Sequence, residues 1–172
     1  LFLGDVVGIS GCSKILNNLL DQIKKNKIDF VIVNAENSAN SGVGLTKEIC
    51  EDFFKCGVNV ITTGNHVWDQ KEIMNFIDKE KRLLRPKNLF EPSPGRGFEV
   101  YVCGHDIKVG VLNLMGNVFM KKCEDIFQTS KDFLSKYHLK EDYDILVVDV
   151  HGEITSEKNA IGHFFDGKAT LV

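Results

Sequence analysis

Four short apolar stretches of this chain each end in residues that can bind a metal ion or a phosphate. Such β-branched and apolar runs are typical of buried strands. In α/β proteins, ligands bind just outside the carboxyl ends of the strands. The pattern therefore predicts one site to which several strands contribute. The stretches are residues 1–3, 30–33, 58–63 and 145–150, followed respectively by Gly4-Asp5, Asn34-Ala35-Glu36-Asn37, Gly64-Asn65-His66 and His151.

Segments with helical periodicity separate these strands, which favours an α/β fold of a single domain over residues 1–172. The first predicted helix has the apolar stripe Ile15, Leu16, Leu19, Leu20 and Ile23. Further helices are expected over residues 46–56, 71–78 and 130–137 and from residue 155, with a β-hairpin over 98–114 and a final strand beginning at residue 169.

Residues 82–97 contain all three prolines and predict an irregular flap or cap segment. Two arginines in it, Arg85 and Arg96, are candidates for substrate binding because a guanidinium can bind a phosphate. Two ordinary surface arginines would give the same pattern, and the sequence favours neither interpretation.

Composition excludes several classes of protein. A net charge of −3 gives no electrostatic footprint for nucleic acid or for a membrane surface, and no apolar run approaches the ~20 residues of a bilayer span. The five cysteines are odd in number and lack C-x-x-C spacing, which favours reduced thiols and a cytoplasmic location over a disulfide framework or a zinc finger.

The residue types at the strand ends indicate metal chemistry. Aspartate, glutamate, asparagine and histidine suit magnesium, manganese, iron or zinc. A carboxylate can bridge two such ions ~3.5–4 Å apart, and metal-bound water ionises to hydroxide near neutral pH. A neighbouring imidazole can then protonate a leaving oxygen.

These motifs resemble those of the calcineurin-like metallophosphoesterases. The chain departs from the common pattern because Asp5-Val6-Val7 lacks a histidine and Glu36-Asn37 replaces an aspartate. Both departures are similar to one bacterial branch, the YmdB-like 2′,3′-cyclic nucleotide phosphodiesterases. Residues 64–69 resemble the calcineurin-like metallophosphoesterases as a whole. Further segments that resemble the bacterial branch are residues 83–88, 94–97, 113–116, 118–120 and 155–158.

The resemblance implies a four-layer α/β/β/α sandwich that hydrolyses a phosphodiester, in particular 2′,3′-cyclic nucleotides, through a two-metal bridging hydroxide. Asp5 and Asn37 would bind the first metal, Asn65 and His151 the second, Glu36 both, and His66 would be catalytic. Iron or manganese is implied, although the ligand types also suit magnesium or zinc. A small phosphodiester is the expected partner, and RNA and a second copy of the chain are left open.

The family pattern also contains a Gly-Thr-His-Thr-His segment, which would begin about where this sequence ends. We therefore expect the 172 residues to lack two histidine ligands and to be inactive by themselves. Two alternatives stay open: a catalytically silent nucleotide- or RNA-binding regulator on the same fold, and a flavodoxin-like domain that holds phosphate without metal.

Overall fold

The structure, a computed structural model, describes all 172 residues. The chain forms two compact units, Leu1–Leu84 and Arg85–Val172. Each is described by itself.

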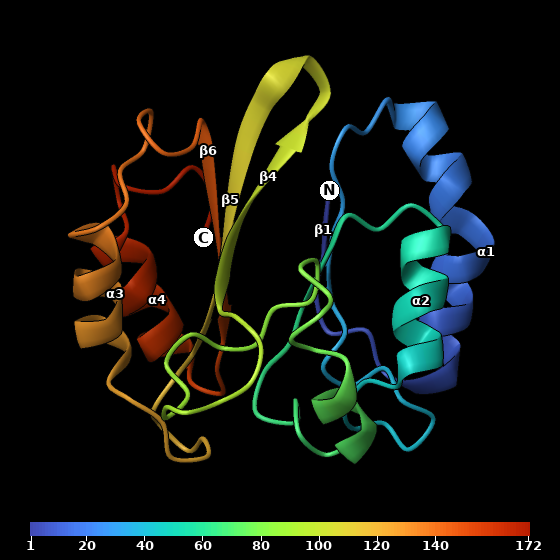
Figure 1. The fold of residues 1–172 in the computed structure, drawn as a ribbon, viewed down its shortest axis with the longest axis horizontal. Coiled ribbons are helices and arrows are strands. Elements are labelled where there is room, and N and C mark those ends of the chain that lie inside the picture. The colour runs from blue at the N-terminus through green and yellow to red at the C-terminus, as the bar shows by residue number, and fades with distance from the viewer. The chain divides into compact units, whose positions relative to one another are not determined.

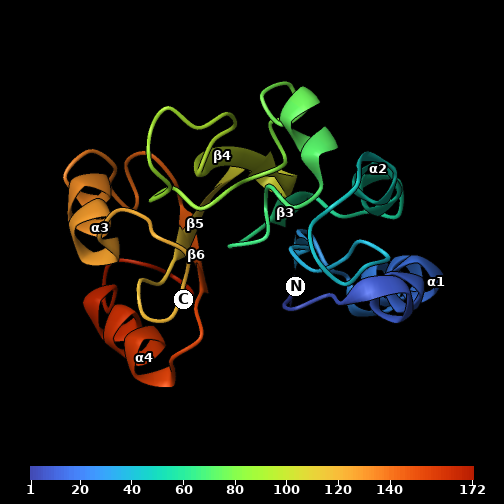
Figure 2. The same cartoon turned by 90° about the horizontal axis from the view of Figure 1, so that it is seen from below.

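The first unit is a parallel three-stranded sheet of order β1-β2-β3. The helices α1 and α2 lie side by side on the same side of this sheet (Figures 1 and 2). Its elements are β1 (Phe2–Leu3), α1 (Gly8–Asn26), β2 (Ile32–Asn34), α2 (Lys47–Lys55), β3 (Val60–Thr62) and a 3₁₀ helix, η1 (Lys71–Asn75).

The middle of this sheet is fully buried, because β2 and β3 consist of residues at most 3% exposed. Helix α2 begins where the Thr46 hydroxyl oxygen accepts a hydrogen bond from the Ile49 amide at 3.3 Å, a standard N-cap. Parallel strands place their carboxyl ends at one edge, and the loops after β1, β2 and β3 therefore leave the sheet together.

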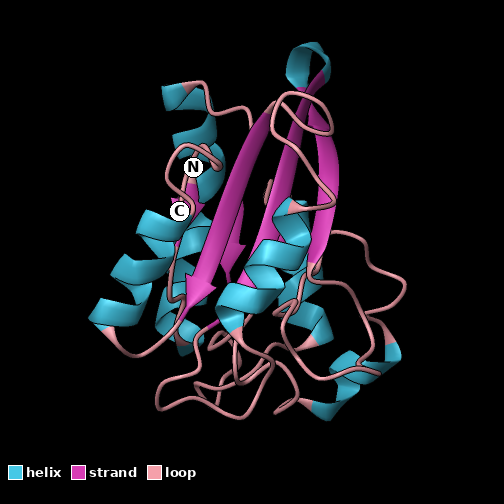
Figure 3. Ribbon diagram, turned by 90° about the vertical axis from the view of Figure 1, so that its left-hand side faces the viewer, coloured by secondary structure: helices cyan, strands magenta, loops and turns pink.

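The second unit contains the sheet β4-β5-β6, in which β4 and β5 are antiparallel and β5 and β6 are parallel. Figure 3 shows its strands as long ribbons that run from the hairpin to a group of loops. Its elements are β4 (Phe98–Cys103), a short 3₁₀ turn, η2 (Gly104–Asp106), β5 (Ile107–Met115), α3 (Ile126–Leu134), β6 (Ile145–His151) and α4 (Thr155–Phe164).

Helices α3 and α4 pack on one face of this second sheet through a core in which aromatic rings are prominent. Phe98 meets the Phe133 ring edge to face, with the ring centroids 4.7 Å apart. The buried cluster consists of Leu112, Leu114, Ile126, Phe133, Tyr143, Leu146, Val148, Ile161 and Phe165.

The α/β class and the hairpin over residues 98–114 are confirmed. The expected helix over 71–78 is wrong, because the structure has the 3₁₀ helix η1 there. The side-chain amide of Gln70 donates to the Val43 carbonyl at 2.9 Å and does not cap a helix, and the Ile73 amide bonds Gln70 in the i→i+3 pattern.

Three further expectations differ from the structure. Helix α3 begins at residue 126, because the Asp125 carboxylate accepts from the Gln128 amide at 2.7 Å. Leu16 and Leu20 are 37% and 48% exposed, so the buried stripe of α1 is narrower than predicted. Residues 82–84 pair with β3 and belong to the first unit, and the irregular segment therefore begins at residue 85. No helix has both the length and the apolar character needed to cross a bilayer.

Candidate functional site

The loops that follow β1 and β2 run alongside each other. The Val6 amide donates to the Asn34 carbonyl at 3.2 Å, and the Gly8 amide donates to the Asn37 carbonyl at 2.8 Å. Val7 and Asn37 also form a parallel bridge. The exits that carry Asp5 and Glu36-Asn37 are therefore neighbours, as the sequence predicts.

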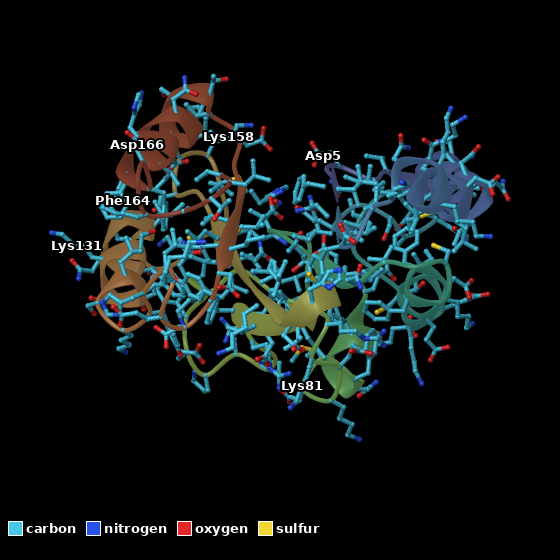
Figure 4. All side chains as sticks on the ribbon, turned by 90° about the horizontal axis from the view of Figure 1, so that it is seen from above. Asp5, Lys81, Lys131, Lys158, Phe164 and Asp166 are labelled. Atoms are coloured by element: carbon cyan, nitrogen blue, oxygen red, sulfur yellow. The ribbon has the colours of Figure 1, made fainter.

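Asp5 lies in the loop between β1 and α1, where Figure 4 labels it. Its side chain is exposed, and its backbone adopts a left-handed conformation with φ of 49°. Aspartate tolerates this region better than most non-glycine residues, but the conformation is uncommon and costs free energy. Such backbone strain often occurs at functional sites.

Glu36 is the central residue of the candidate site, because it follows the middle strand of the sheet. It is 1% exposed, and its Oε1 accepts a hydrogen bond from the His66 amide at 3.1 Å. Its own amide donates to the Asn34 side chain at 3.2 Å. A buried carboxylate is costly unless it is paired or coordinates a metal. Through its hydrogen bond with the His66 amide, the Glu36 carboxylate links the loop after β2 to the loop after β3.

His66 follows β3 and contacts a carboxylate that the sequence-based prediction did not include. Its Nδ1 lies 2.5 Å from Asp69 Oδ2. With the proton assigned to Nδ1, the aspartate holds the ring in one orientation, and Nε2 becomes the nitrogen that can accept a proton. The sequence could have indicated Asp69 by its position, three residues after His66 in the turn that follows the strand.

His151 lies in the second unit. It is the last residue of β6 and pairs with Met115 of β5, and its carbonyl accepts from the Gly116 amide at 2.8 Å. The other five candidates, from Asp5 to His66, lie in the first unit. The inclusion of His151 in their ligand set stays a prediction from the sequence.

The structure gives the two arginines different environments. Arg85 is 4% exposed, and all five of its N–H groups donate within residues 86–94. No N–H group of Arg85 remains to bind a phosphate, and we withdraw it from the substrate-binding candidates. Arg96 is 29% exposed at the side chain and lies 3.6 Å from the Glu99 carboxylate. It stays a candidate.

The side chains at the strand ends have the donor chemistry of a hard-metal site. Carboxylate and amide oxygens with one imidazole suit manganese, iron, magnesium or zinc. No three or more histidine, cysteine, aspartate or glutamate side chains form a metal-binding group in the structure. Of the five predicted ligands, Asp5, Glu36 and His151 are of these types, and Asn37 and Asn65 are amides. The buried Glu36 carboxylate, two residues after the end of β2, has the donor chemistry that a bridging ligand needs.

Fold and site thus define an α/β protein with acidic, amide and imidazole groups at parallel strand ends. The family model of YmdB-like proteins matches residues 1–172, and the chain belongs to this family.

Relatives of known name or structure agree with this assignment. The chain is 38% identical over 172 residues to a Bacillus subtilis 2′,3′-cyclic-nucleotide 2′-phosphodiesterase, covering all of this chain and 64% of that protein. A crystal structure of a hypothetical protein from Thermus thermophilus gives a TM-score of 0.88 at 34% identity, covering 99% of this chain and 64% of that one. A Mycoplasma pneumoniae structure described as a novel phosphatase gives a TM-score of 0.87 at 39% identity, covering 98% of this chain and 60% of that one. The chain spans less than two thirds of these relatives.

Proposed function

We propose that this protein is a metal-dependent phosphodiesterase that hydrolyses 2′,3′-cyclic nucleotides. The observation that carries the proposal is the position of Glu36. Its buried carboxylate follows the middle strand, between the exit that carries Asp5 and the exit that carries Asn65 and His66. The name of the Bacillus subtilis relative supports this choice of substrate.

In this proposal Asp5 and Asn37 would hold the first metal, Asn65 and His151 would hold the second, and Glu36 would hold both. Iron or manganese is the proposed metal. The two ions, when bound, would supply a hydroxide that is nucleophilic at neutral pH. The chain's own residues orient the ions and handle the proton. In the proposed step His66, held by Asp69, takes up a proton at Nε2 and passes it to the leaving oxygen.

Metal analysis of variants of the protein tests this assignment. Glu36→Gln keeps an oxygen that can accept from the His66 amide but removes the charge, and we expect both metals to be lost. Asn65→Ala should mainly reduce the content of one of the two metals. Hydrolysis of adenosine 2′,3′-cyclic monophosphate should be abolished in the first variant.

Equal metal stoichiometry in the two variants would contradict the bridging role. Turnover by metal-free wild-type protein would contradict metal dependence. A wild-type protein that binds the metals and the nucleotide but hydrolyses nothing would favour the alternative of a silent nucleotide-binding regulator.

A further inference from the structure

One aromatic side chain of the second unit is presented to solvent in an unusual way. Phe119 is 84% exposed, and its backbone has a φ of 61°. Burying a phenylalanine side chain stabilises a protein through the hydrophobic effect, and this position forgoes that contribution. A positive φ is also unfavourable for a bulky residue. The fold therefore keeps this ring outside at a cost in stability.

The loop that carries Phe119 is fixed by a buried carboxylate. Glu157 of α4 is 9% exposed, and its Oε1 accepts from the Asn117 amide at 2.8 Å and from the Val118 amide at 3.4 Å. Gly116 admits this carboxylate, since an added Cβ would lie 2.2 Å from Glu157 Oε2. The residues leading to Phe119 are therefore held in place.

The Asn117 side chain fixes the other side of the loop. Its Oδ1 accepts from the Ile126 amide at 3.0 Å, and its Nδ2 donates to the Glu124 carbonyl at 3.1 Å. Because the preceding residues are anchored on both sides, the ring of Phe119 extends from a pre-organised support. Pre-organisation lowers the entropic cost of binding a ligand.

The same loop adjoins His151. The Gly116 amide donates to the His151 carbonyl, and Met115 pairs with His151 in the sheet. Three residues of extended chain span at most about 11 Å, so the Phe119 backbone lies within that distance of Gly116. The sugar and base of one nucleotide can cover such a distance from a phosphate at the end of β6.

We propose that Phe119 is the residue on which the base of the nucleotide substrate stacks. This inference rests on the proposed function, because it assumes that the phosphate binds near His151. An aromatic face binds any base through stacking and reads no hydrogen-bond pattern. The site should therefore prefer substrates that carry a base but discriminate weakly among bases.

Nucleotide binding to the metal-loaded protein tests the proposal, with every variant made in a His66→Ala background so that the substrates are not consumed during the titration. Calorimetry would compare adenosine and cytidine 2′,3′-cyclic monophosphates with ribose 2′,3′-cyclic phosphate, which lacks a base. Phe119→Ala should weaken binding of both nucleotides about 5- to 100-fold and leave the base-free compound unchanged. Phe119→Trp should bind like wild type. Phe119→Leu, which keeps apolar bulk without a π-face, should behave like the alanine variant.

Val102→Ala is the matched control, since it removes a side chain that is 67% exposed near the hairpin, at the other end of β4 and β5. This variant should bind the two nucleotides and the base-free compound as tightly as the protein with Val102 does. Equal nucleotide binding by wild type and Phe119→Ala would overturn the proposal, as would wild-type binding by Phe119→Leu. A change of oligomeric state in Phe119→Ala without loss of nucleotide binding would assign the ring to a second copy of the chain.

The two proposals fail separately. If wild type binds the nucleotides without hydrolysing them, the proposed function fails. A base-dependent loss of binding in Phe119→Ala would still support the stacking role in that case.

Discussion

At the scale of single residues, the pairing of His66 with Asp69 has the most direct chemical consequence. The contact at 2.5 Å fixes one ring nitrogen and leaves the other to exchange a proton. His66 itself is not in the proposed ligand set, although its amide contacts the Glu36 carboxylate. The imidazole and the metals can therefore be tested separately.

We predict that His66→Ala lowers turnover by ~10²–10⁴-fold while metal content stays near normal, because a general acid is lost and no ligand is removed. Asp69→Asn should also lower turnover, since the amide cannot stabilise an imidazolium as a carboxylate does. Kinetics on a cyclic nucleotide together with metal analysis give both readouts. His163→Ala, at an exposed position in the last turn of α4, is the control. A metal loss in His66→Ala as large as in Asn65→Ala would show that its role is ligation.

At the scale of elements, the irregular segment after residue 85 is organised around one guanidinium. Arg85 binds the carbonyls of Pro86, Lys87, Ser93 and Pro94 and reaches the Glu91 carboxylate at 2.7 Å. The hydrogen bond from the Ser93 amide, followed by that from Arg85, holds the pKa of Glu91 below its usual value. A segment without regular hydrogen bonding thus obtains a fixed shape from one side chain.

Replacement of Arg85 should therefore act on stability. We predict that Arg85→Ala lowers the free energy of unfolding by about 3 kcal/mol or more, because buried carbonyls lose a charged partner. Arg85→Lys should rescue little, since an ammonium cannot reproduce the planar fork. Denaturant unfolding measures both.

Arg96→Ala is the matched variant, with a partly exposed ion pair that contributes about 0–1 kcal/mol. It should leave stability nearly unchanged, and any effect should appear in KM. An Arg85→Ala protein of wild-type stability but raised KM would return this residue to the substrate-binding candidates.

At the scale of the whole molecule, buried acidic groups in both units link stability to pH. Burial raises the pKa of the Cys50 thiol from 9.0 to about 12 in the first unit. In the second unit, burial raises the pKa of the Tyr143 hydroxyl to about 12, and partial burial raises that of the Cys123 thiol to about 11. The folded chain thus keeps protons that the unfolded chain releases from about pH 9 upward.

The contribution of these groups to the free energy of unfolding should therefore be constant below pH 9 and should fall as the pH rises toward 12. Each group that stays protonated only in the folded state contributes a slope of about 1.4 kcal/mol per pH unit. Urea unfolding at intervals from pH 8 to pH 11 measures the slope, and Cys50→Ala should make it shallower by about one proton. A stability that stays constant over this range would contradict the assigned burial of these groups.

The sequence by itself determined the α/β class, most of the elements and the strand ends that are followed by polar residues. It could do so because apolar periodicity reports burial, and because a polar residue just after a buried run has few structural explanations. The positions of Asp5, Glu36 and His66 after buried strands were predicted in this way, and the hairpin over residues 98–114 followed from its turn residues.

Only the tertiary structure decided which polar groups are already engaged in hydrogen bonds or ion pairs within the protein. Arg85 and Arg96 are alike in sequence, but one is enclosed by carbonyls and the other is partly exposed, because burial depends on how a segment without periodicity folds back on itself. The hydrogen bond from the His66 amide to Glu36 joins residues thirty positions apart. The loop that presents Phe119 depends on Glu157, which lies about forty positions away along the chain. Contacts over such separations are set by packing, and local sequence patterns carry no record of them.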